Sequence, residues 1–290
     1  MARQTILTPR TNIDVHAVIH VGTPLSGPPE TVLDGAVRGT KNVLQHAARA
    51  GVARIVVTGS VASMAKYEDF WADRLITEQD WNPETYADAF RADKGFFTTY
   101  SVAKMLAERE LHAFAAQHPR IAITSILPPF IYGPFGPGQS TDLDSFWRLS
   151  SNGFLYALIS GPPGRAVAAQ YPVYPAFVHV GDLARAHVAA LRTAPPREGT
   201  VQRVIVSGGA FTWADAVRHI ARVRPALRAR LPRLPEATEA GTEAKEGVCA
   251  RLAVNAEECL GVREYKGWKE TVEETIDDLL RVEKELGLAP

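Results

Sequence analysis

A tyrosine and a lysine stand four residues apart at Tyr100 and Lys104, downstream of a serine that ends an apolar run. Residues at i and i+4 share one face of a helix, so the phenol and the ammonium would lie side by side. The serine is Ser60, which closes the strand-like run that begins at Arg54. A phenol beside a cation, with a hydroxyl close by, can move a proton to a reacting oxygen. We therefore interpret Ser60, Tyr100 and Lys104 as the proton-transfer site of a reductase.

The spacing alone is not specific, because Tyr265 and Lys269 repeat it. The sequence context separates the two pairs. Tyr100 follows one apolar strand and opens a helical run that leads into another, at residues 121–127, whereas Tyr265 has no such strand before it. We predict a catalytic role for Tyr100 and a structural role for Tyr265.

The composition limits the classes of function. Lys plus Arg number 32 and Asp plus Glu number 32, so no net field gathers nucleic acid or an anionic membrane. The first residues lack the apolar core of a signal peptide, and no apolar run approaches the ~20 residues of a membrane helix. Cys249 and Cys259 make neither a disulfide framework nor a zinc site. We expect a cytoplasmic monomer or homodimer without a metal, whose partner is a small molecule and not nucleic acid or a membrane.

The elements that must position the site alternate between strands and helices. A β-branched run at residues 15–21 precedes apolar positions at helical spacing that end at Gly51, and a strand at 54–58 follows. This βαβ unit predicts a parallel sheet with right-handed crossovers. A loop is expected at 128–134, at the carboxyl end of a strand, where open α/β sheets bind ligands. The remaining expected elements are a helix from 100 to about 117, strands at 121–127, 173–180 and 201–206, and helices at 181–191, from about 212, and at 268–286.

Seven stretches of this chain, in this order, resemble the extended short-chain dehydrogenase/reductase family, the group of NAD-dependent epimerases and dehydratases. The similarity is greatest to its dihydroflavonol-reductase and aldehyde/ketone-reductase branch. The matching stretches are residues 17–24, 39–44, 54–60, 77–83, 100–108, 128–134 and 177–187. The resemblance implies an α/β fold, namely a Rossmann-like doubly wound parallel sheet with a smaller C-terminal substrate lobe. It implies an NAD(P)-dependent oxidoreductase that reduces a ketone or aldehyde on a small apolar substrate.

The resemblance also implies roles for single residues. Tyr100 would give a proton to the carbonyl oxygen as hydride arrives from nicotinamide, and Ser60 would hold and polarise that carbonyl. The pKa of a free tyrosine is near 10, and Lys104 would lower it as a nearby cation and bind the nicotinamide ribose. The branch favours NADP, with NAD as the alternative. The cofactor contacts that the resemblance implies are Gly22, Thr23, Tyr100, Lys104, Pro128 and Ile131.

The resemblance also suggests the domain boundaries. We assign residues 1–207 to the dinucleotide-binding domain and 208–290 to a C-terminal substrate lobe with a closing helix. Residues 129–180 would contribute to that lobe. Residues 65–99 are acidic, aromatic and without clear periodicity. Long segments of this kind are usually functional, so we predict a flap over the substrate.

One departure from the family pattern concerns the start of the chain. The family begins with a strand and a Gly-x-x-Gly-x-x-Gly turn that binds the cofactor pyrophosphate, and no such turn precedes residue 15. About 60 residues, or two βαβ units of ~30 residues, would carry it. We therefore expect a truncated gene product and an incomplete Rossmann-like sheet with its first strands absent. Its edge at 15–21 would favour aggregation, and NADPH would bind poorly.

Two other functions remain open from the sequence. A nucleotide-sugar epimerase or dehydratase would share the fold, but dehydratases usually place acidic residues after the strand-end hydroxyl. Val61 and Ala62 follow Ser60 here, which favours simple reduction. The second alternative is a non-catalytic remnant that has lost cofactor binding, and a cofactor titration would separate it from both enzymes.

Overall fold

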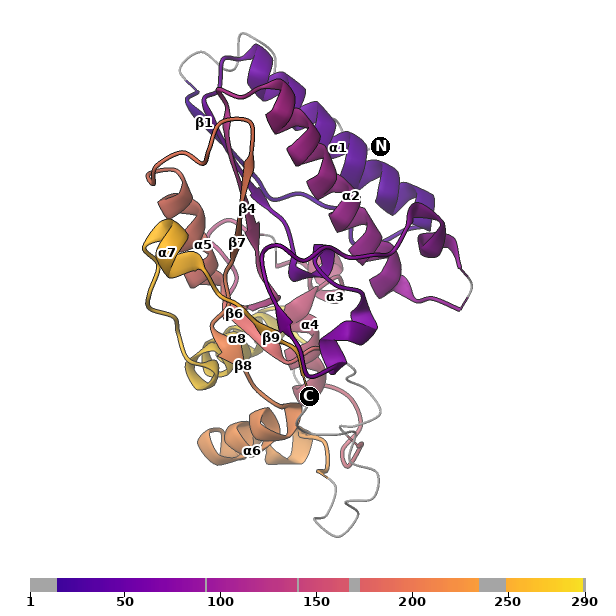
Figure 1. Cartoon of the computed structure of the whole chain (residues 1–290). Helices are drawn as coiled ribbons and strands as arrows, with labels where there is room; N and C mark the ends of the chain where they lie inside the picture. The colour runs from indigo at the N-terminus through magenta and orange to yellow at the C-terminus, as the bar shows by residue number, and fades with distance from the viewer. Residues whose placement is uncertain (1–14, 92, 140, 167–172, 235–248, 289–290) are drawn as a thin grey trace. The chain divides into compact units, whose positions relative to one another are not determined.

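The structure is a computed structural model that describes residues 15–91, 93–139, 141–166, 173–234 and 249–288. Its internal contacts divide the chain into two units (Figure 1). The first, called the sheet unit here, comprises Met1–Pro129, Ala184–Val206 and Ala250–Arg263. The second unit comprises Phe130–Leu183, Ser207–Cys249 and Glu264–Pro290.

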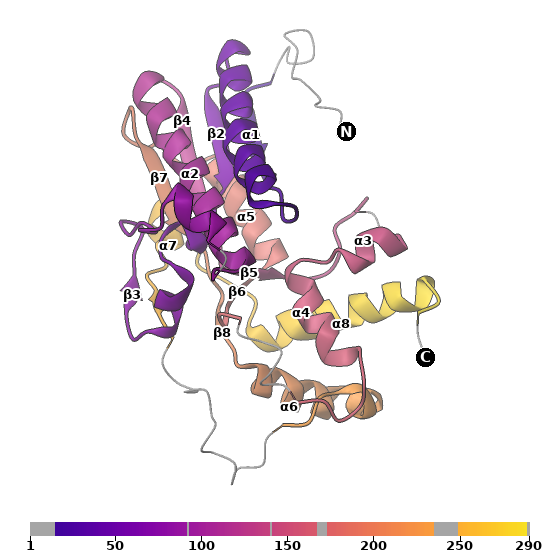
Figure 2. The same cartoon turned by 90° about the vertical axis from the view of Figure 1, so that its right-hand side faces the viewer.

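Four parallel strands form the centre of the sheet unit. They are β1 (Ala17–His20), β2 (Arg54–Thr58), β4 (Ala122–Leu127) and β7 (Val201–Ile205), in the order β1-β2-β4-β7. Parallel neighbours need crossover connections, which α1 (Pro29–Arg49) and α2 (Phe96–Gln117) supply. The two helices lie side by side on one face of the sheet, and α5 (Val180–Ala190) lies on the other (Figures 1 and 2). The parallel α/β fold expected from the sequence is confirmed.

The pattern of β2 explains how the sheet is covered on both faces. Side chains alternate along a strand, so Ile55 and Val57 point to one face, where they join the apolar cluster with Leu44 of α1 and Leu111 of α2. Thr58 points to the other face, where its hydroxyl lies 2.7 Å from His187 Nε2 of α5. Buried on both faces, β2 is held rigidly, and so is the turn that follows it.

Helix α2 begins one turn earlier than the sequence predicts, at Phe96, with Gly95 as its N-cap. The helix therefore carries Phe96 and Tyr100 at i and i+4 on one face. Their ring centroids lie 6.3 Å apart.

Residues 65–99 are less irregular than their sequence indicates. They contain the 3₁₀ helices η2 (Tyr67–Trp71) and η3 (Tyr86–Phe90) and the short strand β3 (Leu75–Ile76). Strand β3 pairs in parallel with β9 (Arg251–Leu252), which the helix α7 (Ala256–Leu260) follows. The sequence had no signal for this pairing, because its partners are separated by more than 170 residues.

Residues 250–263 belong to the sheet unit and not to the C-terminal lobe to which their sequence assigned them. Besides the pairing of β9, the side chain of Asn255 accepts a hydrogen bond from the backbone of Ile205 in β7 at 2.8 Å. It donates another to the carbonyl of Arg203 at 3.2 Å. These bonds attach the segment to the edge strand of the sheet.

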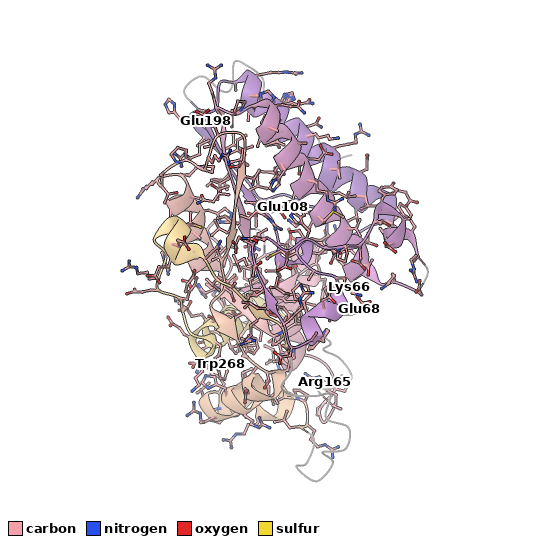
Figure 3. All side chains as sticks on the ribbon, viewed as in Figure 1. Lys66, Glu68, Glu108, Arg165, Glu198 and Trp268 are labelled. Atoms are coloured by element: carbon pink, nitrogen blue, oxygen red, sulfur yellow. The ribbon has the colours of Figure 1, made fainter. Side chains whose placement is uncertain are left out.

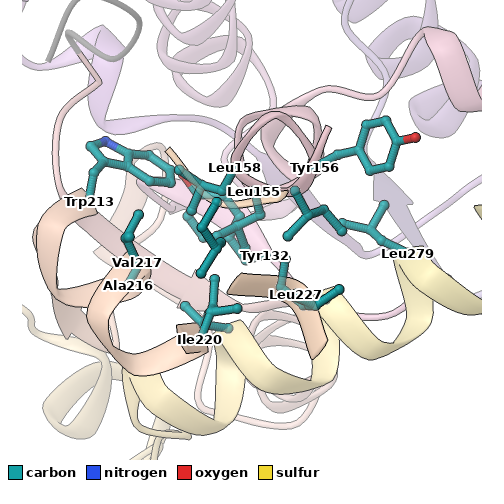
Figure 4. Packing of buried hydrophobic residues seen from close by; sticks show 14 of the residues in the cluster. Tyr132, Leu155, Tyr156, Leu158, Trp213, Ala216, Val217, Ile220, Leu227 and Leu279 are labelled. Atoms are coloured by element: carbon teal, nitrogen blue, oxygen red, sulfur yellow. The ribbon is translucent and has the colours of Figure 1, made fainter. Parts of the chain in front are cut away.

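The second unit is built on a three-stranded sheet and a helical core. Strand β6 (Ala176–His179) pairs with β5 (Phe130–Tyr132) in parallel and with β8 (Gly209–Ala210) in antiparallel fashion. Strand β5 lies where the sequence predicts a loop, because its partner comes from more than 40 residues downstream. The apolar core of the second unit is shown in Figure 4. The helices of this unit are α3 (Leu143–Trp147), α4 (Ser151–Ile159), α6 (Trp213–Val223), η4 (Pro225–Arg230) and α8 (Trp268–Glu285).

Strand β1 is an edge of the described sheet, since it pairs with β2 alone within the residues that the structure describes. Ile19 is 42% exposed and Val21, just after the strand, is 63% exposed. A separate finding concerns the helices: none in the described parts of the chain has the length and apolar character needed to cross a membrane.

Candidate active site

Ser60 lies in a tight turn at the carboxyl end of β2. It is the N-cap of η1 (Val61–Ser63), and its hydroxyl accepts a hydrogen bond from the Ala62 backbone at 3.2 Å. The preceding Gly59 has no room for a side chain, because a Cβ would lie 2.6 Å from Leu127 and 2.9 Å from the hydroxyl of Ser125. The turn is thus fixed against β4, and Ser60 itself is buried.

Tyr100 and Lys104 approach this turn from α2. The Ser60 side chain lies close enough to the Tyr100 phenol to affect the pKa of Tyr100. Lys104 is buried, and its ammonium donates a hydrogen bond to the Thr58 carbonyl at 2.9 Å. Its Nζ lies 5.9 Å from the centroid of the Tyr100 ring. The structure therefore brings Ser60, Tyr100 and Lys104 together within the sheet unit.

The environment sets the protonation of both α2 residues. Burial raises the pKa of Tyr100 above its usual value near 10, and the neighbouring Ser60 side chain opposes this effect. Burial also lowers the pKa of Lys104 to about 8, against the effect of the Glu108 carboxylate. At neutral pH the phenol is protonated and the ammonium is charged. The lowered tyrosine pKa expected from the sequence is not present in this arrangement, because burial of the phenol raises the pKa of Tyr100. The Lys104 ammonium donates its hydrogen bond to a backbone carbonyl.

A small recess, with room for about one water molecule, lies beside Lys104. Gly22 and Thr23, which follow β1, line it together with Lys104 and Thr58. His20 lines it as well, and burial and the charge of Lys104 lower the pKa of that imidazole. An ammonium and hydroxyl groups are suitable hydrogen-bonding partners for a ribose, so the residues present fit the nicotinamide-ribose part of a dinucleotide.

The other two residues expected to contact the cofactor lie in different units. Pro128 follows β4 in the sheet unit, and its carbonyl accepts a hydrogen bond from the Val61 backbone at 3.1 Å, directly behind the Ser60 turn. Ile131 belongs to the second unit, where it sits in β5 and pairs with Val178 of β6.

Sequence reasoning missed a buried charged pair close to the site. Glu108 of α2 and Arg203 of β7 are 2% and 7% exposed, and Arg203 Nε lies 3.0 Å from Glu108 Oε1. Figure 3 labels Glu108 in the interior of the sheet unit. Two local signals point to this pair: Glu108 stands four residues after Lys104, and Arg203 is the one charged residue within the β7 run Val201–Ile205.

His179 and Asp182 are held by contacts within the second unit. His179 Nδ1 accepts a hydrogen bond from the Gly181 backbone at 3.0 Å, and its Nε2 lies 3.0 Å from Glu274. Asp182 accepts one from the Lys266 backbone at 2.7 Å, so it ties the first turn of α5 to the start of α8. Tyr265 precedes α8, which begins at Trp268, so it does not share a helix face with Lys269.

Several aromatic side chains have structural partners. Trp81 stacks on the guanidinium of Arg203, 4.2 Å from its ring centroid. Phe146 and Tyr156 belong to the core of the second unit. Phe96, which lies in the segment expected to form the flap, is 45% exposed beside Tyr100.

Comparison with known proteins gives a consistent set of relatives. An oxidoreductase of Schizosaccharomyces pombe is 32% identical over 221 residues, which cover 73% of this chain and 62% of the relative. The NADPH-dependent methylglyoxal reductase of Saccharomyces cerevisiae is 26% identical, over 93% of this chain and 78% of that protein. The chain thus spans less than two thirds of the length of the S. pombe relative.

Solved structures show the same fold. The crystal structure of Gre2 from Candida albicans in complex with NADPH superposes with a TM-score of 0.76 at 24% identity, over 96% of this chain and 80% of that one. The sequence profile described as the NAD dependent epimerase/dehydratase family matches residues 7–204. The matched range includes Ser60, Tyr100 and Lys104. The chain therefore belongs to the NAD-dependent epimerase/dehydratase family, within the extended short-chain dehydrogenases/reductases.

Proposed function

We propose that this protein reduces a ketone or aldehyde on a small apolar organic substrate with NADPH. The observation that carries the proposal is the convergence of Ser60, Tyr100 and Lys104 at the carboxyl end of β2, where Lys104 lines a small recess with Gly22 and Thr23. Ligands bind at this end of open parallel sheets. The reductase names of the relatives support the same class of reaction.

The residues of the site divide the work of carbonyl reduction. When bound, NADPH supplies the hydride, and Lys104, Gly22 and Thr23 would hold it at the recess. Tyr100, kept protonated by its raised pKa, donates its proton to the carbonyl oxygen. Ser60 holds that oxygen with its hydroxyl, since the Ser60 side chain lies next to the Tyr100 phenol. The charge of Lys104 stabilises the phenolate that remains.

The choice of NADPH rests on the relatives. The S. cerevisiae methylglyoxal reductase is NADPH-dependent, and the C. albicans structure contains NADPH. NAD is the alternative cofactor, and parallel titrations with NADPH and NADH distinguish the two.

The surface next to Tyr100 supports an apolar substrate. Phe96 lies one helical turn before Tyr100, nearly half exposed, with the two rings 29° from parallel. Behind it, Phe97 stacks on Tyr67 at 5.0 Å between centroids, and Tyr67 contacts Trp71. An apolar group attached to the carbonyl would cover Phe96 and gain from its removal from water.

The test is carbonyl reduction by the Tyr100→Phe variant. Loss of the proton donor should lower kcat/KM at least ~10²-fold, because general acid catalysis contributes that much. The purified chain is incubated with millimolar NADPH and a panel of apolar ketones and aldehydes, and the alcohol product is quantified by mass spectrometry. A high cofactor concentration keeps the ratio of rates measurable even when binding is weak.

Tyr265→Phe is the matched control, since it removes the same hydroxyl from the other Tyr-x-x-x-Lys pair. It should retain the wild-type rate. Equal losses in the two variants would contradict the assignment of Tyr100. Absence of any alcohol product with the wild-type chain would favour the non-catalytic remnant.

A further inference from the structure

The buried pair Glu108–Arg203 lies beneath the Ser60 turn and is not needed to explain the proton transfer itself. Arg203 donates two hydrogen bonds to the Glu108 carboxylate, from Nε to Oε1 at 3.0 Å and from Nη2 to Oε2 at 3.2 Å. Removing two charges from water is costly, and an apolar pair of similar size often stabilises a fold as well or better. A role in the geometry of the site would explain why these charges are buried here.

Arg203 uses its remaining donors to hold the segment after β3. Its Nη1 donates hydrogen bonds to the carbonyls of Glu78 and Asp80, the latter at 2.7 Å. The next residues connect this segment to the Ser60 turn, because the Asn82 backbone donates to the Ser63 carbonyl at 2.9 Å. The Asn82 side chain also donates to the Ala62 carbonyl, at 3.2 Å.

Glu108 reaches the turn from the other side, through Ser63. The Ser63 hydroxyl is hydrogen-bonded to the Glu108 carboxylate and lies 2.8 Å from the Ser60 carbonyl. The same carbonyl accepts a bond from the Ser63 backbone at 3.0 Å. One buried carboxylate therefore fixes the hydroxyl that closes the turn of the serine.

Glu108 belongs to the same helix face as the other two α2 residues of the site. Tyr100, Lys104 and Glu108 follow one another at intervals of four, so α2 presents a proton donor, a cation and an anion in line. We propose that Glu108, anchored by Arg203, is a positioning residue for the reduction: it fixes the Ser60 turn against α2 and keeps a negative charge next to Lys104. This inference rests on the proposed function.

The charge next to Lys104 has a separate consequence. Burial lowers the pKa of Lys104 to about 8, and Glu108 works against that decrease. The other titratable groups that face the ammonium are His20 from β1 and Tyr100 from α2 itself, and Arg203 from β7 shares the Glu108 carboxylate. A neutral residue at 108 removes the one anion among them, so the pKa of Lys104 should decrease further.

The first test needs no turnover. Hydrogen–deuterium exchange is measured by mass spectrometry on the 290-residue chain and on the variants Glu108→Gln and Ser63→Ala. Exchange of the peptide that covers residues 59–64 should be about tenfold faster in both variants, as expected on loss of one charge-assisted hydrogen bond. Exchange in α1 should not change. Ser63→Ala leaves the ion pair in place, so it tests the turn even when Glu108→Gln fails to fold.

Glu110→Gln is the matched control, because Glu110 lies on the same helix in a more exposed pair with Lys41. It should exchange like the wild type. Wild-type exchange at 59–64 in Ser63→Ala, or equal changes in Glu110→Gln, would overturn the positioning role.

The second test is the pH dependence of carbonyl reduction. In Glu108→Gln the rate should decrease about tenfold, with KM for NADPH little changed, and its alkaline decline should begin at lower pH. Ser63→Ala should lower the rate without this shift, since it keeps the carboxylate. A wild-type alkaline decline in Glu108→Gln, with Tyr100→Phe inactive, would overturn the inference and leave the proposed function intact. Faster exchange at 59–64 in the variants, together with an active Tyr100→Phe variant, would contradict the proposed function. The conclusion that Glu108 fixes the Ser60 turn would remain valid.

Discussion

Lys104 is a buried lysine, and its environment gives the site a pH dependence. Its pKa of about 8 means that the ammonium is charged below that pH and loses its charge as the pH rises through it. Tyr100 stays protonated in this range, because its pKa is raised. The rate of carbonyl reduction should therefore decline above about pH 8.

The variant Lys104→Arg separates this lysine from other groups that titrate. An arginine keeps its charge at any pH at which the protein is folded, so the alkaline decline should disappear, at a lower rate because the guanidinium has a different shape. Rates measured from neutral to alkaline pH give the comparison. A decline at the same pH in Lys104→Arg would assign it to another group.

The residues of the site differ in how well the sequence predicts them. Tyr100 and Lys104 are separated by one helical turn, so a local pattern suffices to place them together. Ser60 could be added because it ends an apolar strand. Glu108 and Arg203 are 95 residues apart, and no local periodicity indicates that β7 will lie beside α2. Long-range contacts of this kind need the fold.

Among the elements, the segment between β2 and α2 is the one whose function is most open to test. The first part of this segment is held by the pairing of β3 with β9. Of the residues 65–99 expected to form a flap, those from η3 to the start of α2 therefore remain the candidates for movement. This part contains the exposed side chains of Tyr86, Phe90 and Phe96. Phe96 lies next to the proton donor Tyr100, and exposed aromatic side chains suit a lid that closes on an apolar substrate.

Limited proteolysis tests the lid. Trypsin should cut first after Arg91 or Lys94, which lie between η3 and α2, and cofactor with substrate should slow these cuts. Arg263, in the exposed loop after α7, serves as the reference for cleavage unrelated to the site. Equal slowing at Arg263 and at the two flap sites would argue against a lid.

The helices and longer strands around this segment were predicted from hydrophobic periodicity, whereas β3 and β5 are too short to show any.

For the whole molecule, the edge at β1 has the largest expected effect on behaviour. Ile19 is 42% exposed on a strand that pairs on one side alone within the described chain. Edges of this kind associate, and a lysine on the edge prevents it. Ile19→Lys should reduce the light scattering of concentrated protein. Val254→Lys introduces the same charge at a residue of similar exposure, 44%, away from β1, and should have little effect.

Binding of NADPH by the whole chain is also a prediction. The 290 residues contain no Gly-x-x-Gly-x-x-Gly run, and two prolines in the stretch 133–138 lack the N–H groups needed to replace it. Calorimetric titration of monomeric protein should give a dissociation constant weaker than about 1 mM. Micromolar binding would show that other residues hold the pyrophosphate.

The path of the chain between the two units has a consequence for synthesis. The chain changes unit after residues 129, 183, 206, 249 and 263. The sheet unit therefore receives β9 only after residues 130–183 and 207–249 of the second unit have been synthesised. Strand β3 cannot pair with β9 until residue 252 has emerged. The backbone of Ile205 in β7 cannot form its hydrogen bond with the Asn255 side chain until residue 255 has emerged. Folding of the catalytic half is thus expected to be post-translational, and a nascent chain halted before residue 250 should remain protease-sensitive at β3.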